Sequence, residues 1–344
     1  MKHDRTGCWL NGAEPHLPNN LFSGIIIQNT FSMFSMVPSI LSDSPFTHTY
    51  SIIARDERTG EIGAGVQSHW FSVGTVVPWA LAGVGAVVTQ SFTNPAFGPR
   101  GLELLAEGAA PKEAVERMIR ADGGRDFRQL AVIDAHGNAQ AYTGSKCVAE
   151  AGHICRKNCS VQANMMLNDS VWGAMTEAFE NSEGPLAERI MMALEAGESA
   201  GGDARGRQSA AIVTVKAKGT GEVWKDRTVD LRVDDHREPI REMKRLLKVH
   251  RAYDCMNEGD VAMEKGDMAG ALRGYSRAES LYPRNEEMVF WHAVALANNE
   301  RFNESVPLFR KVFAKNPNWR VLLERLPPSG MLRLSQGQIA SLLG

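Results

Sequence analysis

The order of strand-like and helix-like segments is the feature that most constrains the fold of this chain. Two apolar runs with strand character, Tyr50–Ala54 and Ile62–Val66, flank the polar turn Asp56–Gly60, which predicts a β-hairpin. From there to about residue 235, groups of strands are separated by pairs of helices. This order favours an α+β protein with two sheets packed face to face and helices outside. It does not fit a doubly wound sheet, in which helices alternate with single strands.

The segments after the hairpin are assigned from periodicity and turn residues. The glycine-punctuated run Leu81–Val88 is predicted as one buried strand, and Ser91–Gly101 as a loop. Further strands are expected at Gln129–Ile133, Ala139–Thr143, Ser160–Met166, Ala210–Val215 and Asp230–Val233, and helices around Leu102–Ala106, Ala114–Ile119, Val171–Phe179 and Leu186–Leu194.

The sequence divides into three parts. Residues 1–48 scatter Gly, Pro, Asn and Ser without a lasting period; they are expected to be a disordered extension, a removable propeptide, or sequence upstream of the true start. Residues 49–236 carry the predicted sheets. Residues 237–344 are expected to begin with a linker helix and to continue as an all-α domain. A length of 344 residues allows two or three domains, each with its own core.

An internal repeat marks the C-terminal part. Phe309 follows Tyr275 by 34 residues, and Pro317 follows Pro283 by the same interval, which is the period of tetratricopeptide repeats. The small residues of the pattern would let paired helices approach closely, and its aromatic residues would fill the space between them. The pattern covers about two helix pairs, so the repeats are expected to lean on the preceding domain.

Composition and charge narrow the function classes. The chain is 43% hydrophobic and 23% charged, with a net charge of -2 from 38 basic and 40 acidic residues, which is typical of a soluble globular protein. Such a balance gives no reason to expect nucleic acid or an anionic membrane as a partner. No run is long and apolar enough to span a bilayer. The five cysteines lack the spacing of a disulfide framework, which favours the cytoplasm.

The chain resembles a bacterial family, the domain of unknown function 1028 family, which is assigned to the N-terminal nucleophile (Ntn) hydrolase superfamily. The motifs that carry this resemblance are TYSIIARD from Thr49, GVQSHWFSVG from Gly65, GVGAVVTQSFTNPAFGPRGL from Gly83, SVQANMM from Ser160 and GGDARGRQSAA from Gly201. They extend over nearly all of residues 49–235. The resemblance implies a four-layer αββα sandwich, and the helical tail is similar to that of longer family members.

The resemblance also implies a nucleophile at the first residue of the first strand, which is Thr49 here. A free N-terminal threonine can attack a carbonyl through its hydroxyl while its own α-amine takes the proton. His48 precedes Thr49 in this chain, so the bond between them must be cleaved by the chain itself or by another protease, unless the start is misassigned. The expected activity is an amidohydrolase that cleaves a small amide or peptide-like substrate through an acyl-enzyme.

Partners for Thr49 are sought among nearby polar residues. Ser68 ends the second strand of the hairpin, where its side chain could reach Thr49, and Asn164 is the candidate side-chain amide for an oxyanion hole. Gln90 and Asn94 are further candidates for substrate binding. For each residue the alternative is a strand or loop residue that satisfies backbone groups.

The segment GGDARGRQS concentrates charge in a glycine-rich turn. Asp203, Arg205 and Arg207 lie within five residues, followed by Gln208. Arginine binds carboxylates in a bidentate fashion, so one interpretation is a clamp for an acidic substrate with Gln208 near the site. The favoured alternative is an internal Asp–Arg pair that fixes the turn.

A metal site has one candidate location, at Cys147, His153, Cys155 and Cys159. These soft ligands lack a second paired-cysteine knuckle, so ordinary thiols are favoured and neither a metal nor another cofactor is expected. The alternative to the hydrolase is a non-catalytic binding or scaffold protein that docks partners on its helical repeats. In either case the helical part is expected to bind a protein partner or a second copy, and a homo-oligomer is expected.

Overall fold

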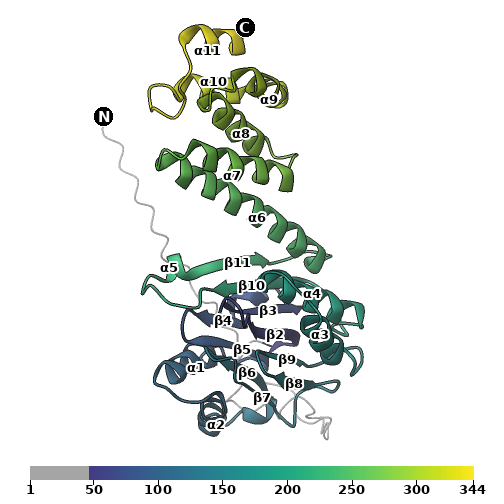
Figure 1. Ribbon diagram of the computed structural model, residues 1–344. Coiled ribbons are helices and arrows are strands. Elements are labelled where there is room, and N and C mark those ends of the chain that lie inside the picture. The colour runs from purple at the N-terminus through teal and green to yellow at the C-terminus, as the bar shows by residue number, and fades with distance from the viewer. Residues whose placement is uncertain (1–45) are drawn as a thin grey trace, which may run out of the picture. The chain divides into compact units, whose positions relative to one another are not determined.

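The computed structural model describes residues 46–344, which form two antiparallel sheets with helices and a C-terminal helical region (Figure 1). Most of the predicted extension, residues 1–45, lies outside the described residues. The strands are β1 (Phe46–Thr47), β2 (Thr49–Arg55), β3 (Ile62–Ser68), β4 (Pro78–Leu81), β5 (Gly85–Phe92), β6 (Arg128–Asp134), β7 (Ala139–Thr143), β8 (Gly152–Arg156), β9 (Cys159–Ala163), β10 (Ser209–Val215) and β11 (Arg227–Val233). The helices are α1 (Phe97–Ala106), α2 (Pro111–Ala121), α3 (Val171–Glu180), α4 (Leu186–Ser199), α5 (Val223–Asp226), α6 (Pro239–Glu264), α7 (Met268–Leu281), α8 (Glu286–Asn298), α9 (Phe302–Lys315), α10 (Asn318–Arg325) and α11 (Gln336–Leu343).

Both sheets are antiparallel throughout the described residues. One runs in the order β1-β5-β6-β7, with β4 also paired to β5, and the other in the order β11-β10-β3-β2-β9-β8. The single strand predicted over Leu81–Val88 is wrong: β4 ends at Leu81 and β5 begins at Gly85. Gly83 has a φ of 75° in the turn between them, a conformation that glycine adopts without a steric cost.

Three hydrophobic clusters lie between the sheets and helices of the first domain. Ile53 and Val66 of one sheet share a cluster with Val88 and Ile133 of the other, so this cluster lies between the two sheets. On the outer face of the β5 sheet, residues of α1 and α2 pack against β5 and β6. On the outer face of the β2 sheet, residues of α3 and α4 pack against β2 and β9, together with the start of α6. Each sheet is therefore covered by helices on one face and by the other sheet on the opposite face.

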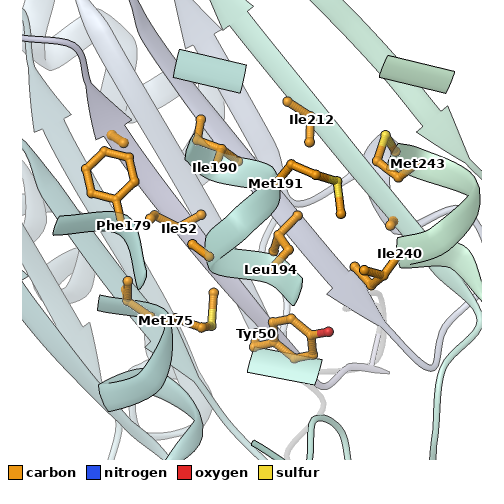
Figure 2. Packing of buried hydrophobic residues seen from close by; sticks show 14 of the residues in the cluster. Tyr50, Ile52, Met175, Phe179, Ile190, Met191, Leu194, Ile212, Ile240 and Met243 are labelled. Atoms are coloured by element: carbon orange, nitrogen blue, oxygen red, sulfur yellow. The ribbon is translucent and has the colours of Figure 1, made fainter. Parts of the chain in front are cut away.

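The alternation of side chains along the strands explains this division. On β2, Tyr50 and Ile52 point to the helices, where Figure 2 shows them beside Met175 and Leu194. Gly65 on β3 is the partner of Ile52 and faces the same helices. A Cβ atom at Gly65 would lie 2.3 Å from Cγ2 of Ile190, so α4 packs onto the sheet only because this position has no side chain.

The helical region begins on the first domain. Ile240, Met243 and Leu247 near the start of α6 belong to the same cluster as α3 and α4 (Figure 2). Further along α6, the Arg251 guanidinium donates to both carboxylate oxygens of Glu188 at 2.7 and 2.9 Å. The helix predicted as a linker is longer than expected: α6 continues to Glu264 and packs along α7. It is therefore part of the helical region as well as its connection to the first domain.

The helices that follow pack as neighbours in the sequence. Tyr275 of α7 lies against Gly259 of α6, where an added Cβ would come within 3.0 Å of its ring. Phe290 of α8 packs on Phe309 of α9, with ring centroids 5.7 Å apart. In the described range, none of the helices has the length and hydropathy that crossing a membrane requires.

Candidate active site around Thr49

Polar side chains gather between the two sheets at one end of the first domain. Because side chains alternate along each strand, the residues of β2 that point to the facing sheet are Thr49, Ser51 and Ile53. Ile53 is part of the apolar cluster between the sheets, whereas Thr49 and Ser51 are fully buried among polar groups. The same alternation places further fully buried polar residues in this layer: Ser68 on β3, Gln90 on β5, Gln129 on β6, Ser160 and Gln162 on β9, and Asn164 just after β9.

Thr49 lies inside a continuous backbone and its hydroxyl donates to the carbonyl oxygen of Thr47 at 3.1 Å. Its own carbonyl oxygen accepts from the Asn164 backbone N–H at 3.1 Å and from the Gln90 side-chain amide at 3.1 Å. These bonds fix the backbone at the start of β2. Gln90 and Asn164 therefore both contact the first residue of β2, through its own carbonyl oxygen and not through the carbonyl oxygen of His48.

The carbonyl oxygen of His48, the residue before Thr49, accepts two side-chain hydrogen bonds. The Ser68 hydroxyl donates to it at 2.5 Å, and Nη2 of Arg205 donates to it at 2.9 Å. Arg205 is held by Asp203, whose carboxylate accepts from Nε at 3.0 Å and from Nη2 at 2.7 Å. The Asp203 side chain is fully buried. Two donors, one of them charged, thus meet on one carbonyl next to a threonine hydroxyl.

The turn before β10 positions the Arg205 guanidinium. Gly202 has a φ of 61°, which suits glycine, and its carbonyl accepts from the Leu167 N–H at 2.9 Å. Asp203 then accepts from the backbone N–H of His69 at 3.2 Å, which ties the turn to the end of β3. The internal Asp–Arg pair that the sequence favoured is present, and in addition Arg205 contacts His48.

The imidazole of His48 is enclosed in the same layer. Its Nδ1 lies 2.6 Å from Oδ1 of Asn164. Desolvation by burial lowers the pKa of His48 to about 4, against an opposing contribution from the Asn164 hydrogen bond. Nε2 is buried and has no hydrogen-bond partner among the described residues. The side chain is therefore neutral at pH 7.

The amide groups around His48 have a determined orientation. Nε2 of Gln129 donates to the carbonyl oxygens of Ala163 at 2.8 Å and Gly152 at 3.2 Å. Its Oε1 must therefore be the atom that accepts from Nδ2 of Asn164 at 2.9 Å. This leaves Oδ1 of Asn164 facing the imidazole, so Nδ1 of His48 carries the proton and donates.

A second group of polar side chains supports Gln90. The Ser51 hydroxyl donates to Oε1 of Gln90 at 2.6 Å, and Nε2 of Gln162 donates to the Ser51 hydroxyl at 2.7 Å. Gln90 also donates to Oε1 of Gln129 at 2.6 Å. The residues Ser51, Gln129, Gln162 and His48 were not among the sequence-based candidates. The period-two alternation of β2, β6 and β9 was the signal that could have identified the first three.

The side chains of the other candidates bind partners other than Thr49. Oδ1 of Asn94 accepts from the Ala96 N–H at 3.2 Å, so its side chain stabilises the turn before α1. Arg207 forms an ion pair with Glu198 at 3.0 Å. The Gln208 side chain donates to Asp235 at 3.2 Å, although its backbone N–H donates to the Ser68 carbonyl oxygen at 3.1 Å.

The cysteines considered as metal ligands occupy different surroundings. Cys159 is buried in the cluster under α3 and α4, and desolvation by burial raises its pKa to about 12. Sγ of Cys147 donates to the carbonyl oxygen of Arg128 at 3.4 Å. The His153 ring lies 2.8 Å from the Thr143 hydroxyl. Among residues 46–344 no three His, Cys, Asp or Glu side chains are grouped so that they could hold a metal ion.

Fold and site together define the class: a mixed α/β protein with two facing antiparallel sheets and a buried polar site where β2 begins. The chain belongs to the DUF1028 family, a family of unknown function, whose model matches residues 49–243. The match begins at Thr49. The domain is similar to the crystal structure of protein SPO2555 from Silicibacter pomeroyi, described as DUF1028, with 34% identity and a TM-score of 0.53 over 58% of this chain and 88% of that chain. A comparison with curated proteins found no significant match.

Proposed function

We propose that this protein is an Ntn-type amidohydrolase whose nucleophile is Thr49, released when the chain cleaves its own His48–Thr49 bond. The observation that supports this most is the pair of donors on the His48 carbonyl oxygen, at 2.5 Å from Ser68 and 2.9 Å from Arg205. Donors that already hold a carbonyl oxygen also stabilise the negative charge that develops on it when the carbon is attacked. A structural role alone would not require a charged donor on this particular carbonyl.

The cleavage uses atoms that are adjacent in the chain. The Thr49 hydroxyl oxygen bonds to the His48 carbonyl carbon, the bond between that carbon and the Thr49 nitrogen breaks, and the hydroxyl proton passes to the nitrogen. The product is an ester with a free α-amine. Water then adds to the ester carbon and the carbon–Oγ bond breaks; one proton of the water passes to Oγ and the other is lost to solvent, while the α-amine keeps the proton it received. His48 leaves as a carboxylate at the end of the released segment, and Thr49 becomes the first residue.

The mature site would work by the same chemistry. An α-amine has an ordinary pKa near 8, so its neutral form can accept the hydroxyl proton near neutrality. Oγ attacks the amide carbon of the substrate, the leaving amine takes the proton, and an acyl-enzyme forms. Ser68 and Arg205 remain in place to stabilise the oxyanion. Asn164 and Gln90, which bind the Thr49 carbonyl, hold the nucleophile in position.

The order of layers in the first domain also supports the proposal. Helices, sheet, sheet and helices follow one another in the hydrophobic clusters, which is the order of layers in the Ntn sandwich that the sequence resembles. For the helical region we propose a tetratricopeptide-like pair of repeats, supported by Tyr275 packing on Gly259 and by the 34-residue interval to Phe309.

Intact-mass measurement of the purified protein tests the cleavage. We expect the wild-type chain and a Thr49→Ser variant to lose residues 1–48, and a Thr49→Ala variant to keep them. The mature protein should then hydrolyse members of an amide panel and the Thr49→Ala protein none. A wild-type chain that stays full-length, or a Thr49→Ala chain cut at the same bond, would contradict self-cleavage.

A second candidate function is partner binding by the helical region. A groove of about 690 Å³ on α7, α8 and α9 is lined by Leu272, Leu296 and Leu308 together with Arg273, Arg277 and Arg301. Apolar grooves with a few polar groups are typical of binding surfaces. A stable full-length chain that hydrolyses no amide but binds a protein partner, or a second copy of itself, through this groove would favour this function.

A further inference from the structure

We propose that the niche holding Phe46–His48 is the acyl-side substrate site of the mature enzyme. Its substrates would be amides with an extended peptide-like acyl part that carries an imidazole, or a similar planar N–H donor, next to the scissile carbonyl. This inference rests on the proposed function and adds a substrate class to it.

The chemistry of the two reactions links the leader segment to a substrate. Self-cleavage passes through an ester between Oγ of Thr49 and the His48 carbonyl carbon, with the α-amine free. An acyl-enzyme formed from a substrate has the same bonds, with the acyl part of the substrate in place of His48. The position of His48 before cleavage therefore shows where the acyl side chain of a substrate is held after attack.

The niche next to the scissile carbonyl is built for a hydrogen-bond donor. Oδ1 of Asn164 faces it, because Nδ2 of Asn164 donates to Oε1 of Gln129 and the orientation of Gln129 is fixed in turn by its bond to the Ala163 carbonyl oxygen. His48 is enclosed in the niche, since none of its surface is exposed. After the leader has left, a substrate without an N–H donor would leave this buried acceptor unpaired, which costs about 10- to 100-fold in reaction rate.

The backbone of the leader is bound as an added strand. Phe46 and Thr47 pair with Phe92 and Ser91 at the end of β5. The first half of the same β5 edge is taken by β4, which pairs with Gly85–Val88. Cleavage would leave the second half of this edge free to bind an extended peptide by strand addition.

Side chains further from the scissile bond are also recognised. The Thr47 and Thr93 hydroxyl groups are hydrogen-bonded to each other. The ring of Phe46 packs edge to face on the ring of Phe92 at 4.2 Å between centroids. Phe46 is 40% exposed, so this third position should contribute less than the histidine position.

The test uses mature wild-type protein whose N-terminus at Thr49 has been verified by intact mass. The substrates are acetyl-Phe-Thr-His p-nitroanilide and the same compound with leucine or phenylalanine in place of histidine. We expect kcat/KM for the histidine compound to be roughly 10- to 100-fold higher. The free peptide acetyl-Phe-Thr-His should inhibit competitively, and its leucine analogue should inhibit more weakly.

A variant tests the outer position independently. Phe92→Leu should lower the ratio of kcat/KM between acetyl-Phe-Thr-His and acetyl-Ala-Thr-His anilides, because it removes the ring contact from only one of the two substrates. Equal rates for the histidine, leucine and phenylalanine compounds would overturn the inference, as would hydrolysis of unrelated amides but none of these. The proposed function itself fails differently, through a chain that keeps residues 1–48 and hydrolyses no amide.

Discussion

Nη2 of Arg205 donates a 2.9 Å hydrogen bond to the carbonyl oxygen of His48, a residue 157 positions earlier in the chain. The guanidinium is oriented by the buried carboxylate of Asp203, which accepts from two of its nitrogens. A fork held in this way loses little freedom when it binds a carbonyl. The positive charge is therefore fixed at the atom that would become an oxyanion during cleavage.

Replacing this fork should slow the release of Thr49. In Arg205→Lys a single ammonium group cannot bind Asp203 through two nitrogens and also reach His48 in the same geometry. Loss of one oxyanion donor typically costs about 100- to 1,000-fold in rate. We expect the half-time of conversion from full-length to mature chain, followed by intact mass during incubation, to lengthen by about that factor.

Arg232→Lys is the matched control, because Arg232 forms a 3.6 Å ion pair with Asp230 and is half exposed. It should convert at the wild-type rate. If Arg205→Lys also converted at that rate, Arg205 would have no part in the cleavage.

The sequence predicted the local parts of this site better than the distant contacts. The hairpin at Thr49 and the strands at Gln129 and Ala210 follow from alternation and turn residues, which depend only on neighbours in the chain. Ser68 could be chosen because it ends the second strand of the hairpin, whose two strands pair in register. Asn164 was chosen mainly on the family resemblance, because β9 pairs with β2 from about 110 residues away.

The contacts of His48 could not be predicted in this way. Strand β1 pairs with the end of β5, about 45 residues later, and no periodicity in two residues can indicate a strand. Arg205 reaches His48 only because the turn after α4 folds back over the end of β3. The break between β4 and β5 was missed because Leu81–Val88 is apolar throughout, and only the turn at Gly83 divides it.

A substitution at Gly65 should show how closely α4 packs on the β2 sheet. In Gly65→Ala the new Cβ would lie 2.3 Å from Cγ2 of Ile190 and 3.2 Å from Cδ1 of Leu194. Overpacking of this kind costs about 1–3 kcal/mol. We expect urea unfolding to give a free energy of unfolding lower by that amount.

The control for Gly65 is Gly173→Ala in α3, where an added Cβ meets nothing within 4 Å. Alanine is the better helix former by about 1 kcal/mol, so this variant should be unchanged or slightly more stable. A Gly65→Ala protein as stable as wild type would show that α4 can move away from the sheet without cost.

The buried imidazole of His48 should make the uncleaved chain sensitive to acid. Burial lowers the pKa of His48 from 6.5 to about 4, so between these values the unfolded chain binds a proton that the folded chain does not. Stability is then fully present above pH 6.5 and falls as the pH decreases toward 4. Between pH 7 and pH 5 this one group lowers the free energy of unfolding by about 2 kcal/mol. Urea unfolding of the Thr49→Ala variant, which keeps residues 1–48, at the two pH values measures this loss.

Other groups titrate in the same range, so the measurement needs the Thr49→Ala/His48→Gln double variant. Glutamine keeps an N–H donor for Oδ1 of Asn164 and has no proton to gain near neutral pH. The difference in unfolding free energy between the two proteins should therefore change by about 2 kcal/mol from pH 7 to pH 5, with the histidine protein losing more. If this difference is the same at both pH values, His48 keeps an ordinary pKa and its niche is open to water. The donor-selective pocket inferred for the substrate would then lose its physical basis, because a hydrated Asn164 would no longer discriminate between acyl groups.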